Sequence, residues 1–136
     1  MSNLKPELSE KNEYWISRHR YYELKHFCLQ YPEWKRAILE LHNKYGYSIT
    51  ERIKSFVISK PTEKIAEQAI FYSNLISLVE NTAYKTDDKL ALYILKGVVE
   101  ERSYTYLRSV LNIPCCRNEY YELYRKFFWI LSNSRK

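Results

Sequence analysis

Glycine is scarce in this chain, with two among 136 residues, and there are only four prolines. Folds built from short strands need many tight turns, and tight turns depend on glycine. The shortage therefore excludes most β-rich architectures and favours long helices joined by short connections. Apolar residues make up 46% of the chain, which is enough for a packed core, so global disorder is not expected. We expect an all-α fold, specifically a helical bundle.

Long apolar runs are also missing. No run approaches the roughly 20 residues that a bilayer-spanning helix needs. The amino-terminal stretch MSNLKPELSEKNEYW contains no basic segment followed by an apolar one, as a secretory signal would. We therefore expect a cytoplasmic protein that has no membrane partner.

Residues that carry chemistry are few and poorly spaced. Cys28, Cys115 and Cys116 have neither an even count nor a Cys-x-x-Cys gap, so we expect free thiols and no disulfide framework. His26 lies two residues from Cys28, a poor spacing for a metal site on a helix. The sequence has no glycine-rich phosphate loop and no Gly-x-Ser-x-Gly elbow. We expect no enzyme, no metal and no cofactor.

Acidic residues are scarce at the two flanks of the chain. Residues 11–60 carry ten Lys/Arg and five Asp/Glu, residues 61–101 carry four and seven, and residues 102–136 carry seven and two. Such asymmetry bears on the partners of a protein rather than on its fold. Polyanions are the favoured partners, ahead of a membrane surface.

The hydrophobic pattern divides the chain into two parts. Over 11–60, apolar residues recur at three- and four-residue spacings, which predicts an N-terminal helical hairpin region whose second helix begins at Pro32. Within it, SITERIKSFVISK at 48–60 fits both strand and helix, and we expect an irregular segment. Over 61–136 we expect a helical core with a C-terminal helix-turn-helix. One compact domain is the alternative to this division.

The carboxyl-terminal stretch RSYTYLRSVLNIPCCRNEYYELYRKFFWIL has the layout of a helix-turn-helix. It follows a predicted helix over 87–100. Ser103 is a candidate N-cap for a short helix over 104–111, and a break of a few residues precedes a longer helix over about 117–131. Apolar side chains at the turn would hold the two helices together: Leu107, Leu111 and Ile113. In such motifs the last helix lies in the major groove of DNA.

The polar residues of this stretch are the candidate nucleic-acid-binding residues. Arg117 and Asn118 lie at the end of the last helix that reaches base edges, where arginine pairs with guanine and asparagine with adenine. Tyr121 and Arg125 lie on the same side. The cations expected at phosphates are Arg102, Arg108, Lys126, Arg135 and Lys136. The alternative for every one of these cations is an ordinary solvated surface.

Three resemblances follow from these stretches. RSYTYLRSVLNIP resembles region 4 of bacterial sigma factors, in which Ser-Tyr begins the second helix and a Leu-x-Ile turn closes it. Over about residues 87–131 the chain is similar to phage transcriptional regulators of the RinA/ArpU type, which implies a DNA-binding regulator. Together, YYELKHFCLQYPEWK, SYTYLRSVLNIPC and YYELYRKFFWIL resemble uncharacterised prophage and mobile-element proteins of Firmicutes. Pro114-Cys115-Cys116 stands where the regulators have Ser-x-x, which leaves the exact contacting residues open.

These features favour two functions. The first is a sequence-specific transcriptional regulator of a phage or mobile element that binds double-stranded DNA, with its N-terminal helices forming a homodimer or meeting RNA polymerase. The alternative is a phage-encoded interaction module, or an inhibitor, that acts on a host protein complex bound to nucleic acid. A structural or packaging protein remains a third option.

Overall fold

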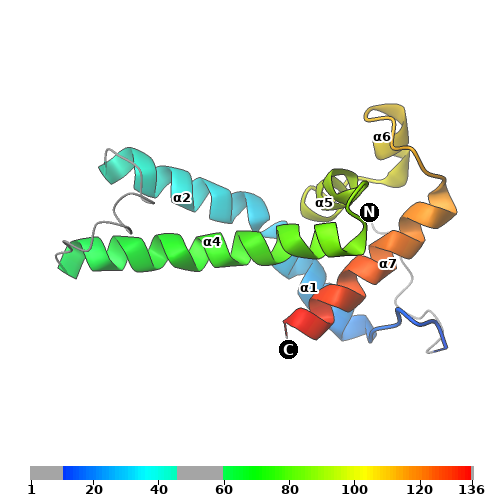
Figure 1. Ribbon diagram of the computed structural model, residues 1–136, viewed down its shortest axis with the longest axis horizontal. Coiled ribbons are helices and arrows are strands. Elements are labelled where there is room, and N and C mark those ends of the chain that lie inside the picture. The colour runs from blue at the N-terminus through cyan, green and yellow to red at the C-terminus, as the bar shows by residue number, and fades with distance from the viewer. Residues whose placement is uncertain (1–10, 46–59, 136) are drawn as a thin grey trace. The chain divides into compact units, whose positions relative to one another are not determined.

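The computed structural model describes residues 11–45 and 60–135, and every regular element in those ranges is a helix. The all-α prediction is therefore confirmed. The helices, shown in Figure 1, are α1 (Arg18–Leu29), α2 (Tyr31–Tyr45), α4 (Lys60–Thr86), α5 (Ala91–Val99), α6 (Tyr104–Ser109) and α7 (Arg117–Ser134). The stretch 48–60, expected to be irregular, lies outside the described residues except for its last position. Among the described helices, none has the length and apolar character to span a bilayer.

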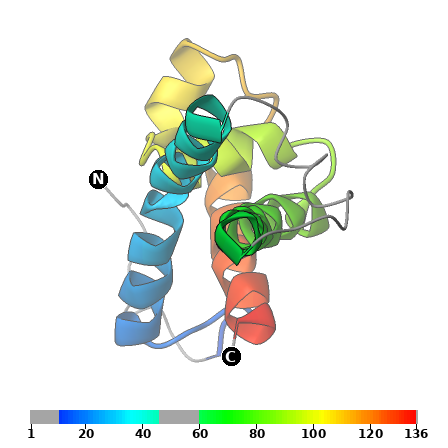
Figure 2. The ribbon, with the colours of Figure 1, turned by 90° about the vertical axis from the view of Figure 1, so that its left-hand side faces the viewer.

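The chain forms two compact units whose boundaries differ from the expected one at residue 60. One unit joins Met1–Gln30 with Leu78–Lys136, and the other is Tyr31–Ser77. The difference arises because α1 packs against α5 and α7, which are far from it in sequence. Figure 2 shows α1 and α7 side by side, with α6 beyond one end of the pair. The C-terminal helices therefore share their core with the first helix.

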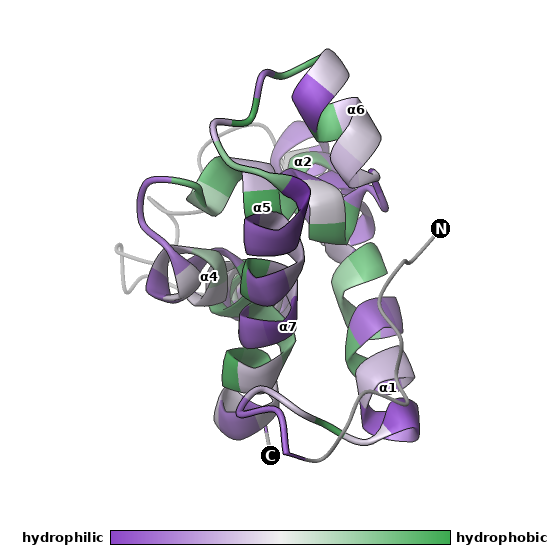
Figure 3. Cartoon of the chain, turned by 90° about the vertical axis from the view of Figure 1, so that its right-hand side faces the viewer, coloured by the Kyte–Doolittle hydropathy of each residue, from purple (hydrophilic) through white to green (hydrophobic). Residues whose placement is uncertain are grey.

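The contact between α1 and α7 is largely aromatic. One face of α1 is buried, with Tyr21, Leu24 and Cys28 each no more than 1% exposed. The Tyr21 hydroxyl lies 3.0 Å from the Tyr124 hydroxyl in a buried hydrogen bond, and the Tyr21 ring meets Phe128 edge-on at 5.2 Å between centroids. Hydrophobic and hydrophilic residues alternate along both helices in Figure 3, as expected for helices with one buried face.

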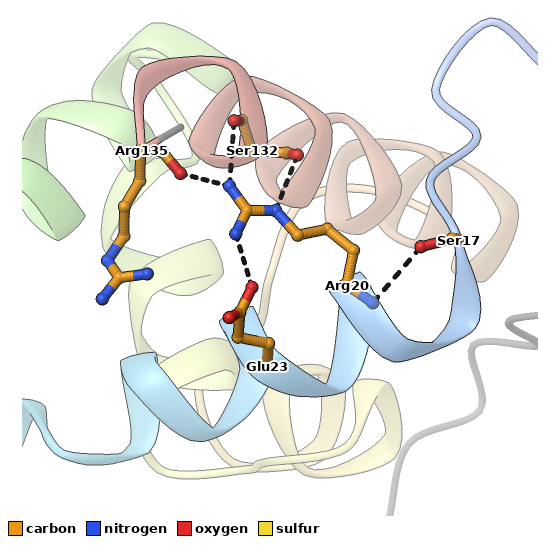
Figure 4. Close-up of polar contacts among 5 residues, drawn as sticks. All are labelled: Ser17, Arg20, Glu23, Ser132 and Arg135. Carbon is orange, nitrogen blue, oxygen red and sulfur yellow. Dashed lines mark hydrogen bonds and ion pairs between the residues drawn. The ribbon is translucent and has the colours of Figure 1, made fainter.

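The N-terminal turn of α1 caps the carboxyl end of α7. Arg20 donates from Nε to the Ser132 hydroxyl at 3.1 Å and from Nη2 to the Ser132 carbonyl at 3.2 Å (Figure 4). It also donates to the Arg135 carbonyl and pairs with Glu23. The last carbonyls of a helix have no partner within the helix and carry partial negative charge, so a guanidinium is well suited to them. Arg20 thus serves the fold.

The junction between α4 and α5 is built from polar side chains. Thr82 and Thr86 are buried, and each hydroxyl donates to a carbonyl one turn earlier, at 2.7 Å. The Asp87 carboxylate then accepts from the backbone N–H groups of residues 89 and 90 at 2.9 and 3.0 Å. Asp87 thus caps this turn, and the regular part of α5 begins at Ala91 rather than at residue 87, where the sequence predicted the helix to begin.

The core of the second unit, as far as it is described, lies between α2 and α4. Ile65 and Ala69 of α4 are buried, and Leu41 of α2 packs against them. Ile65 and Ala69 are four residues apart, a spacing that places apolar residues on one face of a helix. Phe71 remains 59% exposed on α4 and Leu39 remains 56% exposed on α2.

Candidate nucleic-acid interface

Helix α6 begins as predicted and ends earlier than predicted. The Ser103 hydroxyl accepts from the Tyr106 backbone N–H at 3.2 Å, so Ser103 is the N-cap. The helix stops at Ser109 rather than at Leu111, and residues 110–116 form a connection longer than the expected break. Asn112 has a φ of 56°, a left-handed conformation that asparagine tolerates and that turns the chain away from the helix axis.

This connection is fixed by contacts back to α6. Leu107 and Ile113 are completely buried, as predicted, whereas Leu111 is only half-buried. The Ile113 N–H donates to the Leu107 carbonyl at 3.1 Å, and Arg108 Nη1 donates to the Ile113 carbonyl at 2.9 Å. Near the other end, the Tyr104 hydroxyl donates to the Cys115 carbonyl at 2.6 Å. The path from α6 into α7, visible in Figure 1, is thus set at both ends.

Helix α7 buries one side and leaves the other accessible. Its buried residues are Tyr120, Tyr124, Phe127, Phe128 and Leu131. Leu123, next to Tyr124 in the sequence, is only half-buried. Arg117, Tyr121 and Arg125 follow one another at intervals of four, so they lie along one side of the helix.

That side forms one wall of an open hollow with a volume of about 800 Å³. Four of the predicted nucleic-acid-binding residues line it: Arg117, Asn118, Tyr121 and Arg125. Arg117 and Asn118 are exposed, while the other two are half-buried. The rest of the lining is Asp87, Leu90, Glu119, Glu122 and Leu123. The hollow therefore combines cations with carboxylates, which the count of charges along the sequence did not predict.

The three carboxylates of the hollow each have a partner within the protein. Asp87 caps the start of the α5 segment, as described above. Glu122 pairs with Arg125 at 3.2 Å, and Glu119 accepts from the Cys116 thiol at 3.6 Å between sulfur and oxygen. These contacts are local, and they leave Arg117 with no carboxylate in ion-pair range among the described residues.

Arg117 is held instead by α6. Its Nη2 donates to the Thr105 hydroxyl at 3.2 Å, and its guanidinium lies over the Tyr104 ring, 5.2 Å from the centroid. A guanidinium stacked on an aromatic ring gains a cation–π attraction and loses little of its capacity to donate hydrogen bonds. Arg117 therefore remains exposed while its orientation is restrained.

Arg125 is placed differently from Arg117. Besides its pair with Glu122, its Nε is buried and has no hydrogen-bond partner among the described residues. Its side chain is 23% exposed. Arg125 lines the hollow, but most of its side chain is covered, so it is less accessible to a large partner than Arg117.

The cations expected at phosphates are spread over three elements. Arg102 follows α5, lies 3.4 Å from the Glu100 carboxylate and stacks over the Tyr106 ring at 4.3 Å. Arg108 on α6 is exposed, and Lys126 on α7 is half-buried. Arg135 stacks over the Phe27 ring at 4.0 Å, at the end of α7 away from the hollow. Lys136, the remaining predicted phosphate contact, lies outside the described residues.

The cysteines occupy three different environments as free thiols. Cys28 is buried, and burial raises the pKa of its thiol far above the ordinary value. Burial also raises the pKa of the half-buried Cys115, and Cys116 is exposed just before α7. Among the described residues, no group of three or more His, Cys, Asp or Glu side chains is arranged to hold a metal ion.

Comparison with known proteins identified no relative of this chain. No family model matches the sequence, and neither a curated protein nor a solved structure matches it.

Proposed function

We propose that this protein is a sequence-specific DNA-binding regulator, with α5, α6 and α7 as a helix-turn-helix unit and α7 as the recognition helix. The observation that carries the proposal is the common location of Arg117, Asn118, Tyr121 and Arg125 on one accessible side of α7. Two of these, Arg117 and Asn118, are exposed in the first turn of the helix. Their side chains can form paired hydrogen bonds with guanine and adenine in the major groove.

The buried side of α7 supports the same proposal. A recognition helix has to be fixed on its support if it is to present side chains in a defined register. The five buried residues of α7 pack against α1 and α5, and its first turn is tied to α6 through Arg117 and Tyr104. The helix is therefore anchored along its length, with its polar residues directed outward.

The carboxylates of the hollow limit where phosphates can bind. Asp87, Glu119 and Glu122 would repel a phosphate placed in the hollow itself. In this proposal the phosphates meet cations that do not line the hollow, namely Arg102, Arg108 and Lys126, while base edges approach Arg117 and Asn118. Affinity then comes from a small number of phosphate contacts and specificity from the first turn of α7.

The experiment is a fluorescence anisotropy titration of the full chain with labelled duplex DNA at about 50 mM and about 200 mM salt. Three phosphate contacts give a slope of about −2.7 in log K against log salt, which is roughly a 40-fold loss of affinity between the two conditions. Arg108→Gln should reduce the slope by about one contact. Binding that is absent, or that does not change with salt, would contradict the proposal.

A second function is favoured by the composition of the hollow. A surface that combines carboxylates, guanidinium groups and half-buried Leu and Tyr side chains can also recognise a protein. The corresponding proposal is an interaction module, or inhibitor, that acts on a host protein complex bound to nucleic acid. In this case the cations outside the hollow would meet the nucleic acid of that complex.

The two functions are separated by a pull-down from host lysate with and without nuclease treatment. The regulator should lose its nucleic-acid-dependent partners after nuclease treatment. The interaction module should keep a protein partner after that treatment.

A further inference from the structure

The two arginines of the hollow differ in how many donors they can offer. Arg125 uses Nη2 for Glu122, and its Nε is enclosed. Arg117 uses one N–H for Thr105, and its remaining donors are accessible on an exposed side chain. A guanidinium has five N–H donors in a fixed planar arrangement, so a single bond to Thr105 leaves a pair for one bidentate partner.

The support under Arg117 is itself fixed. Tyr104 is buried, and its hydroxyl donates to the Cys115 carbonyl at 2.6 Å. Its ring lies 5.9 Å from the ring of buried Tyr120, between centroids. Tyr104 of α6 therefore contacts both the 110–116 connection and the start of α7. The face of its ring is the platform on which the Arg117 guanidinium rests.

A restrained arginine loses less conformational freedom on binding than a mobile one. Ordering a flexible side chain at an interface opposes binding, and restraint before binding removes part of that opposition. Restraint also fixes direction, and direction decides which base edge a guanidinium can meet with two parallel hydrogen bonds. Both effects act on recognition of one base pair and leave phosphate contacts unchanged.

We propose that Thr105 and Tyr104 are positioning residues that orient Arg117 to recognise guanine in a G·C pair, and that Arg117 rather than Arg125 selects this base. The inference rests on the proposed DNA-binding function. It assigns a role to the exposed threonine of α6, whose hydroxyl accepts from Arg117 and whose side chain is not needed to fill the core.

The test compares Thr105→Val with Thr105→Ser. Valine keeps the shape of threonine and removes the acceptor for Arg117, whereas serine keeps that acceptor. Each full-length variant is first used to select binding sequences from a random duplex pool. The selected duplex is then titrated against a copy in which the preferred guanine is replaced. Melting temperatures measured in parallel show whether each variant keeps the fold.

In the wild type we expect one position with a guanine preference, and Arg117→Ala should remove it. Thr105→Val should weaken the preference by roughly two- to tenfold, without changing the salt slope. Thr105→Ser should retain the preference. Arg125→Lys should leave it intact, because Arg125 is not the residue that selects the base.

Two results would overturn the inference in distinguishable ways. If the wild type binds duplex DNA with a guanine preference that Thr105→Val fully retains, the positioning role is wrong and the proposed function stands. If the wild type binds no duplex at all, the proposed function fails and this inference fails with it.

Discussion

The phenol of Tyr120 lies directly against the backbone of Gly97, so that α7 approaches α5 at a point where no side chain fits. A Cβ atom built on Gly97 would lie 2.0 Å from the Tyr120 hydroxyl oxygen and 3.3 Å from the ring carbon that bears it. Gly97 is buried in the last turn of α5 and has a right-handed helical position there that needs no glycine. Its value is the space that it leaves for Tyr120, which anchors the first turns of the proposed recognition helix.

Replacing Gly97 with alanine should therefore destabilise the protein. Alanine normally stabilises a helix by about 1 kcal/mol relative to glycine, but here the clash displaces a buried tyrosine, and overpacking of this kind costs about 1–3 kcal/mol. The free energy of unfolding is measured by urea denaturation. If Gly97→Ala were more stable than the wild type, the contact between α5 and α7 at this point would have room for a side chain.

Removing the Tyr120 hydroxyl should be tolerated in the wild type and should relieve the clash that Gly97→Ala introduces. The hydroxyl is buried without a hydrogen-bond partner among the described residues, so Tyr120→Phe removes a poorly solvated polar atom at little or no cost. Without the oxygen, the nearest atom to the alanine Cβ is the ring carbon at 3.3 Å.

A double-mutant cycle measures this coupling. Gly97→Ala should cost at least about 1 kcal/mol less in the Tyr120→Phe background than in the wild type, because the two residues are in direct contact. Equal costs in the two backgrounds would contradict the contact between Gly97 and the hydroxyl.

The stabilisation that Arg20 gives to the carboxyl end of α7 should depend on its planar guanidinium as well as on its charge. Arg20→Lys keeps the charge, but a lysine cannot donate in parallel to the Ser132 hydroxyl and to the last carbonyls of α7. We expect a loss of about 1–2 kcal/mol in unfolding free energy. Arg18→Lys, on the exposed start of the same helix, is the matched control and should change stability by less than about 0.5 kcal/mol. Equal losses of stability from the two substitutions would contradict a stabilising role for the contacts between Arg20 and α7.

The ion pair between Lys25 and Glu101 should make a small contribution that depends on pH. The Lys25 ammonium, 2.9 Å from the carboxylate, lowers the pKa of Glu101 below its usual range. A lowered folded-state pKa means that stability is present above the unfolded pKa and is lost as pH falls through the folded value. Glu101→Gln should therefore cost less than about 1 kcal/mol at neutral pH, because the pair is partly exposed.

The difference between Glu101→Gln and the wild type should disappear at acidic pH, once the carboxyl group is protonated in both folded and unfolded chains. Urea denaturation at neutral and acidic pH measures it, with the exposed Glu67→Gln as control. A difference that persists or grows at acidic pH would show that Glu101 acts through something other than its charge.

The helices of this protein follow from local patterns, and their packing does not. The buried faces of α1 and α7 could be predicted because apolar residues at spacings of three and four define one side of a helix. The grouping of α1 with α5 and α7 could not, because it depends on contacts such as that of Tyr21 with Tyr124, which are 103 residues apart. Periodicity specifies which side of a helix is buried, but not which helix covers it.

The candidate site shows the same limit. Arg117, Asn118, Tyr121 and Arg125 were grouped correctly on one side of α7, because helical spacing alone decides that. The supports of Arg117 were missed, since Thr105 lies twelve residues away and carries no signal of its own. The different settings of Arg117 and Arg125 were also missed, because the pairing of Arg125 with Glu122 and the burial of its Nε appear only in three dimensions.

The most direct test of the account is a titration of duplex DNA that compares Arg117→Ala with Arg18→Ala in the full chain at one fixed salt concentration. Each substitution removes one exposed arginine, but Arg18 lies at the start of α1, whose first turn contacts the opposite end of α7. We expect Arg117→Ala to lower the affinity for the selected duplex by roughly fivefold or more, and Arg18→Ala to have little effect. Equal losses from the two substitutions would contradict this expectation, because charge alone would then explain the binding.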